Sequence, residues 1–352
     1  MAYTDIDDPS AYFQANAYTG NGSNGYAITN DGNSDLQPDL WWAKNRDKAY
    51  DHALYDSTRG VAEILVSHST AAAVGGVTDR IASFDTNGFT LNGSVTVNEN
   101  NNPHVAWQWK ANGGTTSSNG DGGITSTVQA NTTAGFSIAT YTGNSNSPSS
   151  IGHGLGVVPK FYIIKQRDAV NAWKVYHSGI ATDAEDYVME LNTEAAREDN
   201  AIWNDTGPTS SVINFTDHGA VNQSGETYVA YSFAEVQGYS KFGKYIGNGN
   251  ANGPFVYTGF KPAFVMQKRT DDVGGFNMVD NKRNVFNVAD RRLFANVANA
   301  ESTTKTAFDF LSNGFKLRDS NTSLNASGST YIYMAFAENP FTTSTGIPTT
   351  AR

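Results

Sequence analysis

The sequence has no cysteine, few charged residues and no long apolar run. Without cysteine, disulfide bonds and thiolate metal sites are excluded, so packing must hold the fold. Charged residues make up 16% of the 352 residues and the formal net charge is −10. This disfavours a nucleic-acid partner, because phosphates are bound by clustered Lys and Arg. No run approaches the roughly 20 apolar residues that span a bilayer, and no signal peptide is visible. We therefore expect a soluble protein, made in the cytoplasm and without membrane insertion.

Sequence motifs that carry catalysis are also missing. The six histidines lack the close spacing of zinc sites, and neither His-Glu-x-x-His nor a Gly-x-Ser-x-Gly elbow occurs. Glycan cleavage needs two carboxylates that flank the scissile bond. The densest acidic cluster, between Asp183 and Glu194, lies in one variable segment without a strand-alternating acid motif. We therefore expect that the protein is not an enzyme.

What the sequence does contain is one pattern used three times. A Pro is followed six residues later by Lys, and twelve residues after that by Asp or His; the sets are Pro38/Lys44/Asp56, Pro159/Lys165/His177 and Pro262/Lys268/Asp280. A Tyr-x-Gly-Asn turn precedes each set, and an Asn that leads to an aromatic strand follows it. These landmarks are Tyr18, Tyr141 and Tyr245, then Asn98/His104, Asn222/Tyr228 and Asn325/Tyr331. A fixed order of landmarks with variable loops indicates a repeated supersecondary unit.

The repeat predicts an all-β fold of three tandem β-sandwich-like modules with little helix. Short β-branched or aromatic runs begin just after each Pro, and the closing run alternates, as in Val105, Trp107 and Trp109. A stretch rich in Gly, Ser, Thr and Asn has no counterpart later in the chain and is predicted to be a linker. The predicted organisation is an arm and module 1 in residues 1–110, the linker 111–133, module 2 in 134–237, module 3 in 238–341 and a tail 342–352.

Five landmark residues are candidate surface contacts: Lys44, Lys165, Lys268, Trp41 and Trp42. The three lysines have two interpretations, as ligand-binding cations or as structural residues whose stems cover apolar surface. We favour the structural interpretation, in which the Asp that ends the next strand pairs with the first and third Lys. The two neighbouring tryptophans point to opposite faces of a regular strand, so one of them is expected to be exposed.

Metal binding is retained only as an alternative. The polar turn from Asn30 to Asp35 offers oxygen ligands for Ca²⁺, although it does not follow the helix-loop-helix calcium pattern. No other cofactor is expected. Turns rich in Asn, Ser, Thr, Tyr and Trp present neutral hydrogen bonds and flat apolar faces, which suit sugars or other proteins.

The landmarks resemble a known family. Tyr-Thr-Gly-Asn-Gly at 18–22, the segments 36–46 and 52–60, and the later segments 229–235 and 333–341 are similar to repeated modules in virion proteins of marine tailed bacteriophages. The resemblance covers nearly the whole chain. Such proteins are described as structural, tail-fibre-like or lectin-like, so the resemblance implies a virion surface protein without catalytic residues to transfer.

From this resemblance we expect a non-enzymatic phage protein located on the virion. Host-surface recognition at the tail, through a glycan or protein receptor, comes first, and capsid decoration is the close alternative. A host-glycan depolymerase is a distant third. The expected partners are other virion proteins and a host surface molecule, and a homo-oligomer is compatible with the sequence. The three modules either imitate a three-fold unit or lie in a row, and the sequence leaves both open.

Overall fold

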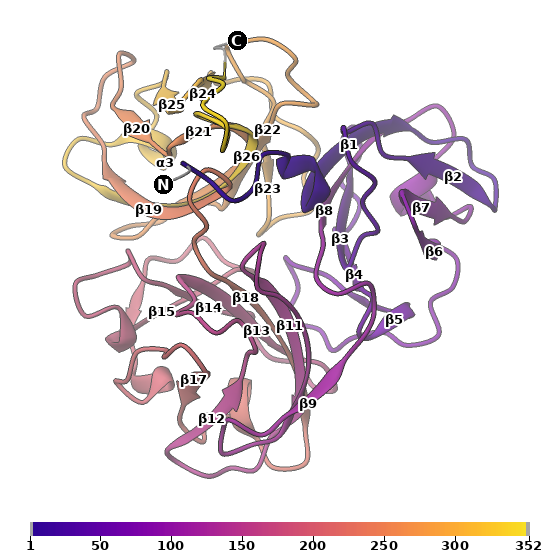
Figure 1. Ribbon diagram of the computed structural model, residues 1–352, viewed down its shortest axis with the longest axis vertical. Coiled ribbons are helices and arrows are strands. Elements are labelled where there is room, and N and C mark those ends of the chain that lie inside the picture. The colour runs from indigo at the N-terminus through magenta and orange to yellow at the C-terminus, as the bar shows by residue number, and fades with distance from the viewer. Residues whose placement is uncertain (1–2, 350–352) are drawn as a thin grey trace.

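The computed structural model of the chain describes residues 3–349, and its fold is all-β (Figure 1). These residues form 26 strands, three α-helices of four residues each and three short 3₁₀ helices. The predicted all-β class with little helix is therefore confirmed. None of the helices within residues 3–349 has the length and apolar character that a membrane crossing requires.

Three large antiparallel sheets share one strand order. In each sheet the closing strand, which is the last strand of the repeat, lies between the first strand and the strand that carries the landmark Lys. Two further strands continue the sheet on the side of the Lys strand. The first sheet has the order β1-β8-β3-β4-β5, with β1 Phe13–Thr19, β8 Pro103–Trp109, β3 Leu40–Asn45, β4 Ala53–Asp56 and β5 Gly60–Leu65. We call strands β1–β8 unit 1, strands β9–β18 unit 2 and strands β19–β26 unit 3.

The sheets of units 2 and 3 repeat this order. Unit 2 adds strands at both edges and runs β16-β15-β14-β13-β18-β11-β10-β9, with β16 Glu198–Asp199, β15 Tyr187–Glu190, β14 Lys174–His177, β13 Phe161–Gln166, β18 Thr227–Phe233, β11 Phe136–Thr142, β10 Ser126–Asn131 and β9 Ser117–Asn119. Unit 3 runs β19-β26-β21-β22-β23, with β19 Ser240–Ile246, β26 Thr330–Pro340, β21 Phe260–Arg269, β22 Asn277–Asp280 and β23 Leu293–Phe294.

A smaller sheet accompanies each large one. The small sheets are β2 Tyr26–Thr29, β7 Gly88–Leu91 and β6 Ile81–Asp85; β12 Ser149–Gly152 and β17 Val212–Phe215; and β20 Phe255–Tyr257, β25 Gly314–Leu317 and β24 Phe308–Leu311. The helices are α1 Val95–Asn98, α2 Gly219–Asn222, α3 Thr322–Asn325, η1 Pro9–Ala11, η2 Ala184–Asp186 and η3 Ala201–Trp203. Apolar residues of the small and large sheets pack together in units 1 and 3, and in unit 2 Tyr141 of the large sheet stacks on Phe215 of the small one, so each unit is sandwich-like.

The stretch predicted to be a linker, residues 111–133, carries strands β9 and β10. Strand β10 pairs with β11 and extends the large sheet of unit 2. The buried amide of Gln129 in this strand donates to Ser57 and Thr58 of unit 1. The stretch is therefore integrated into the fold where units 1 and 2 meet.

The Tyr-x-Gly-Asn landmark forms the same hydrogen-bonded turn in each unit. In unit 2 the buried Asn222 side chain accepts the backbone N–H of Asn144 at 2.8 Å, and the Tyr141 hydroxyl donates to the Val221 carbonyl at 2.7 Å. The corresponding bonds recur in units 1 and 3 at 2.7–2.8 Å. A Cβ on Gly143 would lie 2.3 Å from the Gln223 carbonyl oxygen, so this turn requires glycine.

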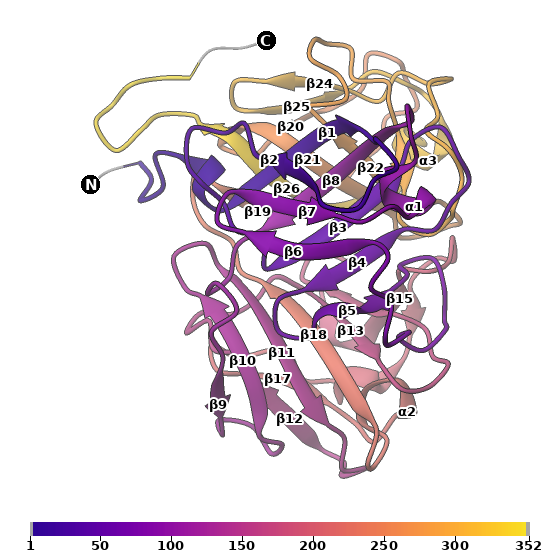
Figure 2. The ribbon, with the colours of Figure 1, turned by 90° about the vertical axis from the view of Figure 1, so that its right-hand side faces the viewer.

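The three large sheets turn one face toward a common centre. Figure 1 shows unit 1 at the right, unit 3 at the upper left and unit 2 below, and Figure 2 shows unit 2 beneath the other two. Trp109, Phe233 and Phe336 hold the same position in the three closing strands, since they pair with Leu40, Phe161 and Phe264. Their ring centroids form a triangle with sides of 6.2, 5.7 and 5.9 Å. One apolar core thus joins all three units, which are arranged around a centre rather than in a row.

We expect Gly143→Ala to lower the free energy of unfolding by about 1–3 kcal/mol, because the added methyl must displace packed backbone. Gly75→Ala is the matched control, since a Cβ there meets nothing within 4 Å. This control should leave stability unchanged or raise it by about 0.4–1 kcal/mol. Equal stability of both variants in urea denaturation would contradict the proposed role of the turn.

Candidate functional site

The two tryptophans predicted as candidate contacts are both buried, at 0% exposure for Trp41 and 5% for Trp42. They do point to opposite faces of β3, as expected for a strand. Trp41 packs against Phe89 of the small sheet, with centroids 5.3 Å apart, and Trp42 packs against Trp107 in the central core. The expectation that one of them is exposed is therefore wrong. Both faces of this central strand are covered, which strand alternation alone does not reveal.

The three landmark lysines, predicted as candidate surface contacts, are also buried. Their ammonium groups donate to backbone carbonyls, with the shortest bonds from Lys44 to Asn45 at 2.7 Å, from Lys165 to Gln166 at 2.7 Å and from Lys268 to Arg269 at 2.9 Å. Burial lowers the pKa of each lysine to about 8. Two of them cross to a neighbouring unit, since Lys165 reaches the Thr70 carbonyl and Lys268 the Glu194 carbonyl. Their role is structural, but without the predicted carboxylate partner.

The two landmark aspartates pair with arginines instead of lysines. Asp56 binds Arg59 at 2.5 Å, and Asp280 binds Arg283 at 2.6 Å, with all four side chains fully buried. In both cases the other carboxylate oxygen accepts the backbone N–H of the same arginine, at 2.8 and 2.9 Å. An Asp-x-x-Arg sequence at the end of a strand could have predicted these pairs, because the turn that follows the strand brings the Arg side chain back to the Asp carboxylate.

These strand-end residues also connect the units in a cycle. The Asp56 carboxylate of unit 1 accepts the Tyr231 hydroxyl of unit 2 at 2.7 Å, and the Asp280 carboxylate of unit 3 accepts the Trp107 indole N–H of unit 1 at 3.0 Å. In unit 2 the equivalent His177 contacts the Tyr333 carbonyl of unit 3 at 3.0 Å. Each landmark therefore binds the next unit, in the order 1 to 2, 2 to 3 and 3 to 1.

The chemistry of His177 is fixed by its two partners. Its Nδ1 accepts the Gly179 backbone N–H at 2.9 Å, so its Nε2 carries the proton that is donated to the Tyr333 carbonyl. Burial lowers the pKa of His177 to about 4, which keeps the ring neutral near pH 7. The ring serves as a hydrogen-bonding connector and not as a base that faces solvent.

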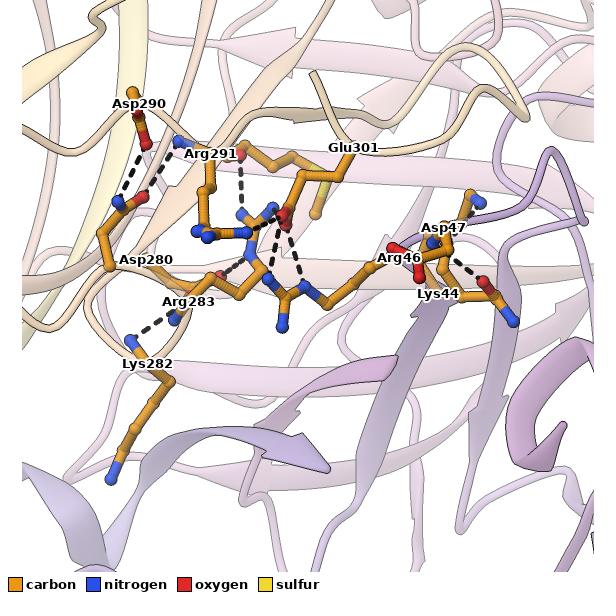
Figure 3. A network of polar contacts seen from close by, with 12 residues as sticks. Lys44, Arg46, Asp47, Asp280, Lys282, Arg283, Asp290, Arg291 and Glu301 are labelled. Carbon is orange, nitrogen blue, oxygen red and sulfur yellow. Dashed lines mark hydrogen bonds and ion pairs between the residues drawn. The ribbon is translucent and has the colours of Figure 1, made fainter. Parts of the chain in front are cut away.

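Units 1 and 3 meet around one buried carboxylate, Glu301 (Figure 3). Arg46 of unit 1 binds Glu301 through two nitrogens, at 2.8 and 3.0 Å, and Arg283 and Arg291 each bind it at 3.0 Å. Burial raises the pKa of Glu301, but the hydrogen bond from Arg46 and the nearby guanidinium charges outweigh it and lower the pKa to about 2. Arg283 also binds Asp280, so the network continues into the strand-end contact described above.

The turn proposed as a calcium alternative lies beside this seam. Asn30 is buried, where its amide donates to Gln108, and Asp31 pairs with Lys282 of unit 3 at 2.7 Å. The Gly32 N–H donates to the side chain of Gln14. Within residues 3–349 no group of three or more His, Cys, Asp or Glu side chains is arranged to hold a metal. Asn30, Asp31 and the Gly32 N–H therefore make contacts within the chain, whereas Asn33 is exposed.

A cleft of about 510 Å³ opens between units 1 and 3. Its lining combines residues of η1, β1 and the Asp31 turn with residues of β21, β26 and the turn after β22. Its lining residues are Ser10, Phe13, Gln14, Ala15, Ala17, Asp31, Gly32, Asn33, Ala263, Asn281, Lys282, Val285, Ala337, Glu338 and Asn339. This volume falls in the range of about 300–1,000 Å³ that small-ligand pockets occupy. None of the five predicted contact residues lines this cleft. It is the candidate functional site, and the sequence reasoning missed it.

Residues 8–340 match a protein family described as "Domain of unknown function (DUF7483)". The chain belongs to this family. The match begins just before η1 and ends with the last residue of β26, so it includes all three units and both walls of the cleft. A search of the curated proteins found no match.

We expect Glu301→Gln to lower the free energy of unfolding by about 3–5 kcal/mol, because three arginines lose their common charge partner in a buried site. Glu235→Gln is the control. It breaks the Lys241–Glu235 pair, whose side chains are 35% and 30% exposed, and should cost about 1 kcal/mol or less.

The same variant should change the acid sensitivity of the fold. Because the folded pKa of Glu301 is about 2 and its ordinary value is 4.5, its stabilisation is complete above pH 4.5 and is lost as the pH falls toward 2. Glu301→Gln should therefore show a smaller loss of stability over this pH window in urea titrations. Two results would show that the Glu301 network does not stabilise the seam. One is an unchanged pH dependence of the free energy of unfolding in Glu301→Gln, and the other is an equal loss of this free energy in Glu301→Gln and Glu235→Gln.

Proposed function

We propose that the chain is a non-enzymatic bacteriophage virion surface protein that contacts the host at the tail. The proposal starts from the resemblance of its repeats to virion proteins of marine tailed bacteriophages. It is supported by how the landmark residues of these repeats are used, because they build and connect the units. In such a protein the framework is rigid and recognition falls to surface features between and around the units.

The observation that carries the proposal is the closed arrangement of the three units. The aromatic triangle of Trp109, Phe233 and Phe336 and the three strand-end contacts hold the units around one centre. A single chain of this form presents a nearly three-fold body, which suits attachment at a symmetric axis such as a fibre tip. A rigid body also keeps a recognition cleft in one shape, which lowers the entropy cost of binding.

Capsid decoration is the second candidate, and the same three-fold arrangement favours it. Positions where three capsid subunits meet offer a symmetric site to a body with three similar units. A decoration protein would bind the head and stabilise it, whereas a receptor-binding protein would bind host cells or their surface polysaccharide. The two candidates therefore differ in location on the particle.

Immunogold labelling of intact particles with an antibody against the chain tests the proposal by electron microscopy. We expect the label at the tail. Label spread over the head would overturn the tail assignment and support capsid decoration. Particles that carry no label, in a preparation whose denatured proteins react with the antibody, would overturn both.

A further inference from the structure

The cleft between units 1 and 3 exists because small side chains occupy its walls. Ala15 and Ala17 line it from one face of β1, and Ala263 and Ala337 line it from unit 3. Ala17 is exposed, whereas Ala15, Ala263 and Ala337 are buried at 3%, 7% and 2% exposure, so Ala17 offers most of the accessible alanine surface.

Comparison among the three units shows that one of these positions, Ala15 of unit 1, holds a larger residue in units 2 and 3. Ala15 pairs with Trp107, and the residues in the same register of the other two units are Ile138, which pairs with Tyr231, and Phe242, which pairs with Met334. Both larger side chains are buried in the central core. Ala15 also belongs to the central core, at 3% exposure, but its methyl group occupies less volume there than Ile138 or Phe242.

The charges at the cleft occur as pairs. Asp31 of unit 1 and Lys282 of unit 3 form an ion pair at 2.7 Å, with side chains 64% and 35% exposed. Glu338 accepts from Lys261 at 3.0 Å and from the Asn281 amide at 2.7 Å. Each carboxylate therefore has a cationic partner, and the site has little net charge to attract an ion.

The lining of the cleft contains both hydrogen-bonding groups and apolar side chains. The hydrogen-bonding groups include exposed Asp31 and Asn33, and the accessible apolar side chains include Ala17 and Val285. A sugar ring offers the matching surface, since its hydroxyls both donate and accept hydrogen bonds and its C–H groups pack on apolar side chains. A strongly charged ligand would meet a like charge at one of the two pairs.

We propose that this cleft binds a neutral saccharide, with hydroxyl groups held by the Asp31–Lys282 pair and neighbouring amides and the ring packed against the exposed side chains of Ala17 and Val285. The inference rests on the proposed host-contacting function and adds the site and the ligand class. The rim geometry is held from within the chain, because the Gln14 amide donates to the Ser10 and Ser34 carbonyls at 2.9 Å and accepts from Gly32. The Asp31 turn therefore needs no ligand to order it.

A variant whose cleft is blocked by a large side chain tests the proposed saccharide site. Ala17→Phe puts a large ring into the cleft from an exposed strand position, so it does not disturb the core. Ala27→Phe is the matched control, because Ala27 is also exposed on a strand of unit 1 and lies outside the cleft lining. Thermal melting of both variants, compared with the wild type, verifies that each is folded.

The probe is a glycan array that carries neutral hexose and hexosamine oligosaccharides next to uronic-acid oligosaccharides, followed by saturation-transfer NMR with the best neutral sugar. We expect the wild type and Ala27→Phe to bind neutral sugars equally, and Ala17→Phe to bind at least tenfold more weakly. Unchanged binding by folded Ala17→Phe would overturn the assignment of the site. Binding confined to uronic acids would overturn the ligand class, and binding to no sugar would overturn the inference as a whole. Particle labelling is an independent readout, so tail label without sugar binding would reject this inference and leave the proposed function standing.

Discussion

Burial of both faces of each large sheet is the constraint on which the rest of the structure depends. A small sheet covers one face of a large sheet, but the other face carries Trp109, Phe233 or Phe336 at its centre and has no cover within its own unit. Exposing such aromatic faces to water would be costly, since each large aromatic side chain buries about 150–250 Å². The three sheets remove these faces from water by meeting one another. Because the chain has no cysteine, this shared core has to supply the stability that disulfide bonds give to some small domains.

The shared core also explains where the charged and polar landmarks lie. When two sheets meet, their strand ends come together and bring backbone carbonyls and polar side chains out of water, and each needs a partner. Asp56, His177 and Asp280 satisfy groups of the next unit, and Glu301 gathers three arginines where units 1 and 3 meet. Removing one partner from a buried polar contact lowers the free energy of unfolding by more than the contact itself contributes, because the other partner stays buried without a hydrogen bond. These residues therefore specify which units meet. The cleft lies along the same seam, where Ala15 occupies a register position that holds the larger Ile138 and Phe242 in the other units.

The sequence predicted what depends on local pattern and repetition. The all-β class and the alternating closing strand with Val105, Trp107 and Trp109 follow from alternation and turn residues that lie close together in the chain. The burial of Trp41 and Trp42 could not be predicted from local pattern. It depends on a small sheet and on a central core, and residues far along the chain contribute to both. The Lys and Asp landmarks were placed in the correct strands but paired wrongly, since a three-residue turn brings Arg59 and Arg283 closer to the aspartates than any lysine. The cleft could not be found, because its walls come from β1 and β26, which are more than 300 residues apart.

Differential scanning calorimetry of the whole chain tests the central claim most directly, because units that share a core must unfold together. At about 0.7 kcal/mol per residue near 60 °C, the total enthalpy should be on the order of 250 kcal/mol for the 352 residues. The account predicts one transition whose van't Hoff enthalpy equals this calorimetric enthalpy. Three separate transitions, each with about a third of the total enthalpy, would contradict it, because they would mean that each unit is stable without the central core.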